Sequence, residues 1–157
     1  MKNFFRKVAF GIGLNEEVPS DPLNWALNQV DKIPDFSWKG KILTEKELRG
    51  HYRDWVYGDR EKLRKKYKNN KTLYKLNKDQ LRHDTGQKFW GPLEIAIRHN
   101  EAINSNNPVL AKLWMFWGNF FAISEKDFLA DYSTGAYQRE IIWPNLDQSF
   151  EKMVYDV

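Results

Sequence analysis

Residues 108–123 read Pro-Val-Leu-Ala-Lys-Leu-Trp-Met-Phe-Trp-Gly-Asn-Phe-Phe-Ala-Ile, and this stretch decides the fold. At 3.6 residues per turn, its apolar side chains form two adjacent stripes. The first stripe consists of Leu110, Leu113, Trp114, Trp117 and Phe121, and the second of Phe116, Phe120 and Ile123. A helix with two apolar stripes needs neighbours on more than one side, so the stretch predicts a buried central helix. Its sixteen residues, interrupted by Lys112 and Asn119, fall short of the ~20 apolar residues of a membrane span.

Side chains that can accept hydrogen bonds from free backbone N–H groups mark further helix starts. The expected starts are Asp21-Pro22, Thr44 to Glu47, Asn77 to Gln80, Asn107-Pro108 and Ser124. The helix after Thr44 is expected to break near Gly58, and Ser133-Thr134-Gly135 is expected to form a turn. A helix from about Ala136 must be disturbed near Pro144, because proline removes a hydrogen-bond donor.

No alternating run of strand-forming residues bounded by turn residues is present. The sequence therefore predicts an all-α, irregular multi-helix domain around the aromatic helix. A chain of 157 residues can bury most of its apolar surface in one core. We accordingly expect a single helical domain over residues 1–157.

The aromatic helix also carries a family resemblance. The relevant segments are Phe116-Trp117-Gly118-Asn119-Phe120-Phe121, residues 137–145 (Tyr-Gln-Arg-Glu-Ile-Ile-Trp-Pro-Asn) and Ser149-Phe150, preceded by Arg6 to Gly11 and Asp21 to Trp25. In this order they resemble the motifs of the bacterial domain of unknown function 1800 family. Two positions depart from the family pattern, because Phe120 and Trp143 stand where the family has histidine and arginine. The resemblance covers the ends of the chain well and residues 36–90 hardly at all.

The resemblance implies that the chain is a truncated domain, the N-terminal part of a longer family domain. It also implies a possible site at Asn119, Arg139, Glu140 and Asn145. Asn119 is expected to be a buried amide that bonds a neighbouring loop. Arg139 and Glu140 are expected to form an internal ion pair, or to pair with Asp127 or Asp131.

Family members are often exported, but this chain shows no signal peptide, and its compartment stays open. The family further implies a possible protein partner of the phosphatase or sulfatase type. Self-association is the other expectation, because Leu146, Phe150, Met153 and Val154 follow helical spacing near the C-terminus.

The net charge of +4 hides a segregation of charge along the chain. Residues 60–78 hold nine Lys and Arg side chains against the single acid Glu61, so this basic segment carries +8 and the rest carries −4. Such a segment can be a solvated helix face, a polyanion-binding surface or a docking site for an acidic protein. If a polyanion binds, the contacts come from Arg60, Lys62, Arg64, Lys65, Lys66, Lys68, Lys71 and Lys75. Tyr67 and Tyr74 could stack bases, but lysine dominates and no nucleic-acid motif is present, so nucleic acid is not the expected partner.

Signals for catalysis are weak. The absence of Cys excludes a thiol nucleophile, and His51, His83 and His99 lack the spacing of a helical zinc site, so no metal or cofactor is expected. The leading hypothesis is a non-catalytic helical interaction or accessory domain. The alternatives are part of a hydrolase-like enzyme completed by a C-terminal region, and a polyanion-binding module built on the basic segment.

Overall fold

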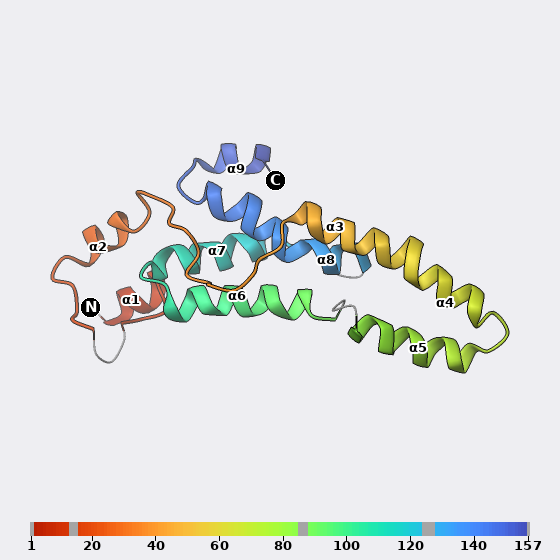
Figure 1. Cartoon of the computed structure of the whole chain (residues 1–157). Helices are drawn as coiled ribbons and strands as arrows, with labels where there is room; N and C mark the ends of the chain where they lie inside the picture. Colours follow the sequence, from red (N-terminus) through yellow and green to blue (C-terminus); the bar gives the residue numbers. More distant parts are fainter. Residues whose placement is uncertain (1, 13–15, 85–87, 124–127, 157) are drawn as a thin grey trace. The chain divides into compact units, whose positions relative to one another are not determined.

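The computed structural model describes residues 2–12, 16–84, 88–123 and 128–156, and every regular element within these ranges is helical. The predicted all-α class is therefore confirmed. The elements labelled in Figure 1, with the π-helical and 3-10 segments between them, are α1 (Lys2–Val8), α2 (Pro22–Asn28), α3 (Glu45–Arg53), η1 (Asp54–Asp59), α4 (Arg60–Lys66), α5 (Lys71–Asp84), α6 (Trp90–Asn104), α7 (Pro108–Phe120), α8 (Phe128–Tyr137), η2 (Gln138–Ile142), η3 (Trp143–Asn145) and α9 (Phe150–Asp156). None of the helices in these ranges combines the length and apolarity needed to cross a membrane.

The chain divides into two compact units. Unit 1 comprises Met1–Lys41, Ala96–Ile123 and Tyr137–Val157, and unit 2 comprises Ile42–Ile95 and Ser124–Ala136. The single domain expected from the sequence stays a prediction. The helix start expected at Ser124, and the pairing of Arg139 with Asp127 or Asp131, involve residues or side chains outside the described part of the structure.

The core of unit 1 is built on Trp114 of α7. Its ring contacts Phe36 and Trp143 at centroid distances of 5.4 and 5.1 Å, and Phe36 stacks on Trp143 at 4.7 Å. The two indole N–H groups donate to the backbone oxygens of Gln138 and Pro34, at 2.8 and 3.1 Å. Both buried tryptophans thus keep a hydrogen bond, which removes the cost of an unsatisfied donor.

The aromatic helix α7 is buried on one side and exposed on the other. Leu110 and Trp114 of the first stripe are at most 1% exposed, as expected for a core helix. Phe116 and Phe120 of the second stripe are 56% and 60% exposed, so the burial predicted for that stripe is wrong. Among the described residues, the close packing of α7 against η2 lies on the Trp114 side, where Gly118 lies against the Gln138 side chain.

The start of α7 shows why local patterns identify some helix caps and miss others. Pro108 occupies the first turn as predicted, but the Asn107 side chain makes no cap hydrogen bond. The free N–H of Val109 donates instead to Oε1 of Gln29, 3.1 Å away and 80 residues earlier in the chain. At α2 the predicted cap is confirmed, because Asn24 N–H donates to Asp21 Oδ1 at 3.1 Å.

In unit 2, α3, η1 and α4 follow one another without a break. The predicted capping box is present, since the Thr44 hydroxyl accepts from Glu47 N–H and Glu47 accepts from Thr44 N–H. The break expected near Gly58 is wrong, because the chain widens there into the π-helical turn η1 and remains helical. After α4, a short turn leads into α5, whose first N–H groups are capped by Asn70 through Leu73 N–H at 3.0 Å. The start predicted at Asn77 is therefore wrong by about two turns.

A second cluster in unit 2 packs Leu43, Leu48 and Ala136 against Trp90. Ser133-Thr134-Gly135, expected to form a turn, lies inside α8. A Cβ at Gly135 would come within 2.3 Å of the Glu94 side chain, so the glycine permits close helix packing rather than a turn. The disturbance predicted near Pro144 is confirmed, because the helix passes into the π segment η2 and then into η3, which contains the proline.

Candidate functional site

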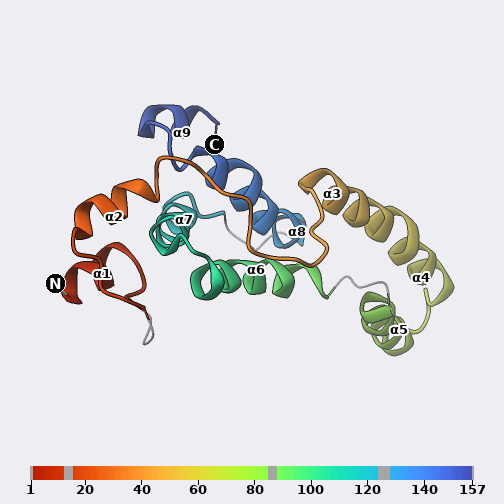
Figure 2. The ribbon, with the colours of Figure 1, turned by 60° about the vertical axis from the view of Figure 1, so that its left-hand side comes forward.

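The basic segment folds into a helical hairpin in unit 2. Figures 1 and 2 show α4 and α5 side by side, and Figure 1 shows that they run in opposite directions. Arg60 and Arg64 lie one turn apart on α4, and Lys68 follows in the turn. On α5, Lys71, Tyr74, Lys78 and Arg82 recur every three or four residues and therefore share one face. The hairpin thus brings two rows of cationic side chains together.

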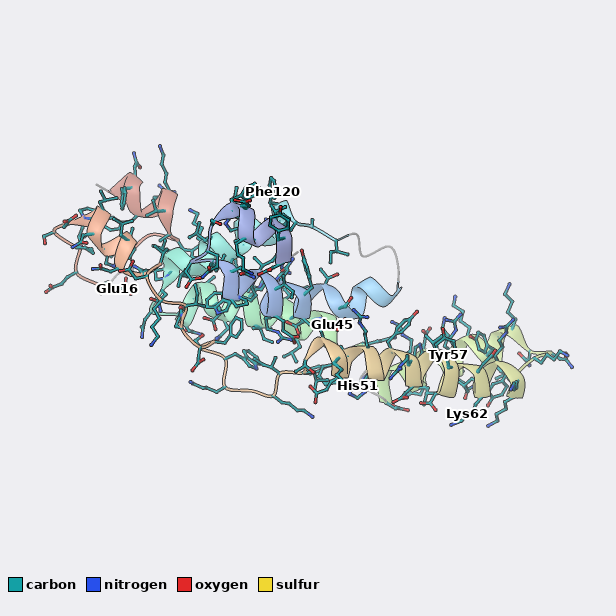
Figure 3. All side chains as sticks on the ribbon, turned by 90° about the horizontal axis from the view of Figure 1, so that it is seen from above. Glu16, Glu45, His51, Tyr57, Lys62 and Phe120 are labelled. Atoms are coloured by element: carbon teal, nitrogen blue, oxygen red, sulfur yellow. The ribbon has the colours of Figure 1, made fainter. Side chains whose placement is uncertain are left out.

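An open groove of about 810 Å³ lies along the tip of the hairpin. It is lined by Arg60, Glu61, Arg64, Lys65, Tyr67, Lys68, Lys71 and Tyr74. Five of these side chains are cationic and one is acidic, so the groove carries a positive charge. Figure 3 shows side chains ending in nitrogen that extend from the ribbon around the hairpin tip.

A smaller pocket of about 270 Å³ lies further from the tip. Trp55, Arg60, Lys78 and Arg82 line it, and none of these described lining residues is acidic. Arg60 lines both hollows, so the groove and the pocket adjoin at this residue, and together they are here called the trough. Its cationic residues are Arg60, Arg64, Lys65, Lys68, Lys71, Lys78 and Arg82.

The π-helical turn η1 determines the backbone spacing between Trp55 and Arg60. In η1 the Arg60 N–H donates to the carbonyl oxygen of Trp55, five residues earlier, instead of to the residue four positions back. Both residues line the pocket. Trp55 is only 2% exposed, so its buried indole is an apolar part of the pocket lining.

Five of the eight cationic residues expected to bind a polyanion line the trough, and three do not. Lys62 lies 3.5 Å from Asp59, the Lys66 ammonium lies over the Tyr67 ring at 5.2 Å, and Lys75 is exposed on α5. Sequence reasoning missed the contributions of Trp55 and Arg82. The spacing of Arg82 could have identified it, because it lies one helical turn beyond Lys78. It lies outside the segment with the highest charge density.

The carboxylate in the groove offsets little of its charge. Glu61 Oε1 lies 3.4 Å from Arg64 Nη1, and the Arg64 side chain is 74% exposed. An exposed pair of this kind contributes about 0–1 kcal/mol. The remaining cations repel one another across the trough, and a bound anion would relieve that repulsion.

Three of the residues implied by the family resemblance, Arg139, Glu140 and Asn145, make contacts within unit 1. Asn119 is exposed on α7, so its predicted burial is wrong, because it lies on the side of the helix away from the Trp114 core. The Arg139 side chain is only 5% exposed and lies 3.7 Å from Glu140, whose side chain is 35% exposed, so this pair is internal on the arginine side only. Asn145 donates to the Ile141 carbonyl at 2.8 Å and thereby supports the irregular η2–η3 backbone.

The histidines show no shared site in the described part of the chain. His83 and Asp84 lie 3.6 Å apart with both side chains more than half exposed, and the His51 ring lies against Trp90 in unit 2. Among the described residues, no three His, Asp or Glu side chains are grouped closely enough to hold a metal ion.

Comparisons of the chain with protein-family models, with curated proteins and with solved structures return no match. The resemblance to the domain of unknown function 1800 family therefore stays a prediction. The trough is the feature that the geometry of the described residues favours as a binding site.

Proposed function

We propose that this protein is a helical interaction module that binds a polyanion in the trough of its basic hairpin. The observation that carries the proposal is the convergence of seven cationic side chains, from α4, α5 and the turn between them, on two adjoining hollows. A merely solvated helix face would spread its charges to reduce their repulsion. Here the hairpin concentrates them instead, and a polyanion is the partner that such a surface fits.

Binding of this kind depends on release of the counterions that surround the polyanion. For a surface with six to ten charge contacts, affinity for DNA falls roughly 10³-fold or more as salt rises from about 50 to about 200 mM. The seven cationic residues of the trough fall in that range. We therefore expect steeply salt-dependent binding to heparin, which serves here as a polyanion of known charge.

The test compares two variants that lose the same charge. Replacing three cationic residues in the trough, Arg64→Gln, Lys68→Gln and Lys71→Gln, should weaken heparin binding by about 10-fold or more. The matched control replaces Lys62, Lys66 and Lys75 by Gln, outside the trough, and should weaken it much less. Equal losses in both variants, or no heparin binding by the parent protein, would contradict the proposal.

A second candidate is protein binding through an aromatic surface of unit 1. Trp117 stacks on Phe150 with ring centroids 5.4 Å apart, and Phe120 and Phe150 are each more than half exposed. Exposed apolar surface of this kind often marks a protein interface. A phosphatase- or sulfatase-like partner, and a role as part of a hydrolase-like enzyme, stay predictions.

A further inference from the structure

The structure points to one class of polyanion: we infer that the trough binds single-stranded nucleic acid. One phosphate group occupies the pocket of Trp55, Arg60, Lys78 and Arg82, and the strand continues along the groove. This inference rests on the proposed function and adds the identity of its ligand.

The composition of the trough differs from that of the whole basic segment. In the sequence of the basic segment, the excess of lysine over arginine argues against nucleic acid as the partner. In the hairpin, however, the three residues left outside the trough, Lys62, Lys66 and Lys75, are all lysines. The trough itself contains Arg60, Arg64 and Arg82. Arginine presents a planar fork of donors that matches phosphate oxygens, so the residues best suited to phosphate lie within the trough.

The pocket has the size and charge of a phosphate site. Arg60 from α4 faces Lys78 and Arg82 from α5, and no acidic residue among those described lines the hollow. The buried ring of Trp55 also lines the pocket, and an apolar surface there strengthens the attraction between the cations and an anion. The π-helical turn joins Trp55 and Arg60 through the bond from Arg60 N–H to the Trp55 carbonyl, and such turns often occur at functional sites.

The spacing of the cationic side chains fits an extended strand. Arg60 and Arg64, like Lys78 and Arg82, are four residues apart, which corresponds to a rise of ~6 Å along a helix. Neighbouring phosphates of an extended single strand are separated by a distance of the same order. A duplex fits less well, because its bases are paired and stacked on one another and cannot lie on an aromatic side chain of the groove.

The groove also offers an aromatic face. Tyr74 lines it half-buried, and its side chain has no hydrogen-bond or ring partner among the described residues. Tyr67 lies nearby, fixed by the hydrogen bond from its hydroxyl to Asn77 Oδ1 at 3.4 Å. Aromatic rings between cationic side chains are the pattern by which proteins hold single strands, since a base stacks on the ring while its phosphate meets a cation. Tyr74 is therefore the expected stacking residue.

The experiment measures binding of the whole protein to a fluorescein-labelled oligothymidylate of about 12 nucleotides, by anisotropy. Tyr74→Ala should weaken binding roughly 10-fold, whereas Tyr74→Phe, which keeps the ring, should bind like the parent protein. Neither change should alter heparin binding. Lys78→Gln/Arg82→Gln should weaken oligothymidylate binding about 10-fold, and the matched control Lys62→Gln/Lys75→Gln much less.

Competition distinguishes the other classes of partner. A duplex of oligothymidylate with oligoadenylate, or poly-glutamate of equal total charge, should compete poorly with the single strand. If poly-glutamate competes equally well, the ligand is an acidic protein surface and the inference is wrong. If Tyr74→Ala leaves binding to the oligonucleotide unchanged, or lowers heparin binding equally, the inference is also wrong. In both cases the proposed function still stands, provided heparin binding depends on the trough.

Discussion

Gln138 connects three segments of unit 1 through a single buried residue. Its side-chain oxygen accepts from Arg98 Nη1 at 2.7 Å, its amide nitrogen donates to the Gly118 carbonyl at 3.2 Å, and its backbone oxygen accepts from Trp114. The residue is 5% exposed, so each of these polar groups would be costly to leave unpaired. The position of η2 against α7 therefore depends on an amide as well as on apolar packing.

Replacing this amide with an apolar side chain of similar length tests its contribution. Gln138→Met removes the partners of Arg98 and of the Gly118 carbonyl, so we expect a loss of about 1–3 kcal/mol in the free energy of unfolding. Urea unfolding followed by circular dichroism measures it. Gln148→Met is the matched control, since the Gln148 side chain is exposed and donates only to its neighbour Asp147 among described residues. Equal stability of the two variants would show that the Gln138 network contributes nothing.

At the level of elements, two glycines lie in helices but differ in their surroundings. A Cβ at Gly135 in α8 would come within 2.3 Å of the Cβ and Cγ atoms of Glu94. These atoms lie close to the backbone of α6 and cannot swing aside. Gly50 in α3 has no atom within 4 Å of the same position, so it contributes only the flexibility of a glycine.

The two positions therefore predict opposite effects of the same substitution. Gly135→Ala should destabilise unit 2 by about 1–3 kcal/mol through overpacking. Gly50→Ala should stabilise it by about 0.5–1 kcal/mol, because alanine loses less conformational entropy in a helix. Thermal unfolding of both variants measures the difference. A stabilised Gly135→Ala protein would mean that α8 and α6 are not in close contact there.

The helix starts show which parts of the fold the sequence could predict. The helix caps at Asp21 and Thr44 can be predicted because each side chain bonds a backbone N–H only three residues away, and such a bond depends on a short sequence motif. The cap of α7 by Gln29 spans 80 residues and leaves none. The π-helical turns were missed for a related reason, because one extra residue per turn has no characteristic composition.

For the candidate site, the sequence predicts the segment of the chain that is involved but not the face that its side chains form. The high density of Lys and Arg between residues 60 and 78 identified the basic segment. It did not identify the face, because the turn between α4 and α5 decides which cations oppose one another. Asn70 caps α5 there and fixes that turn, whereas Asn77, the expected helix start, lies in mid-helix and holds Tyr67. Trp55 and Arg82 join the site only through this hairpin geometry.

For the molecule as a whole, the exposed aromatic surface of unit 1 predicts association. Phe120 and Phe150, with the partly covered rings of Trp117 and Phe121, form a cluster whose centroids lie 5.0–6.5 Å apart. Burying such surface between molecules is favourable by ~25 cal/mol per Å². We expect sedimentation equilibrium at micromolar concentration to show self-association. Phe120→Ser/Phe150→Ser should reduce it, and Leu76→Ser, at an exposed leucine of unit 2, should not. A parent protein that stays monomeric would contradict this prediction.

The concentration of positive charge in the hairpin also has a kinetic consequence. Its residues 60–78 carry +8 while the rest of the chain carries −4, so the electric field outside the hairpin is strongly one-sided. Such a field orients an approaching anion before any contact forms and raises the rate of productive encounters. At physiological ionic strength this field extends only about 8–10 Å from the hairpin. It therefore acts on a partner that diffusion has already brought close to the hairpin. The position of the charge on these nineteen residues therefore affects the association rate of the partner as well as its affinity.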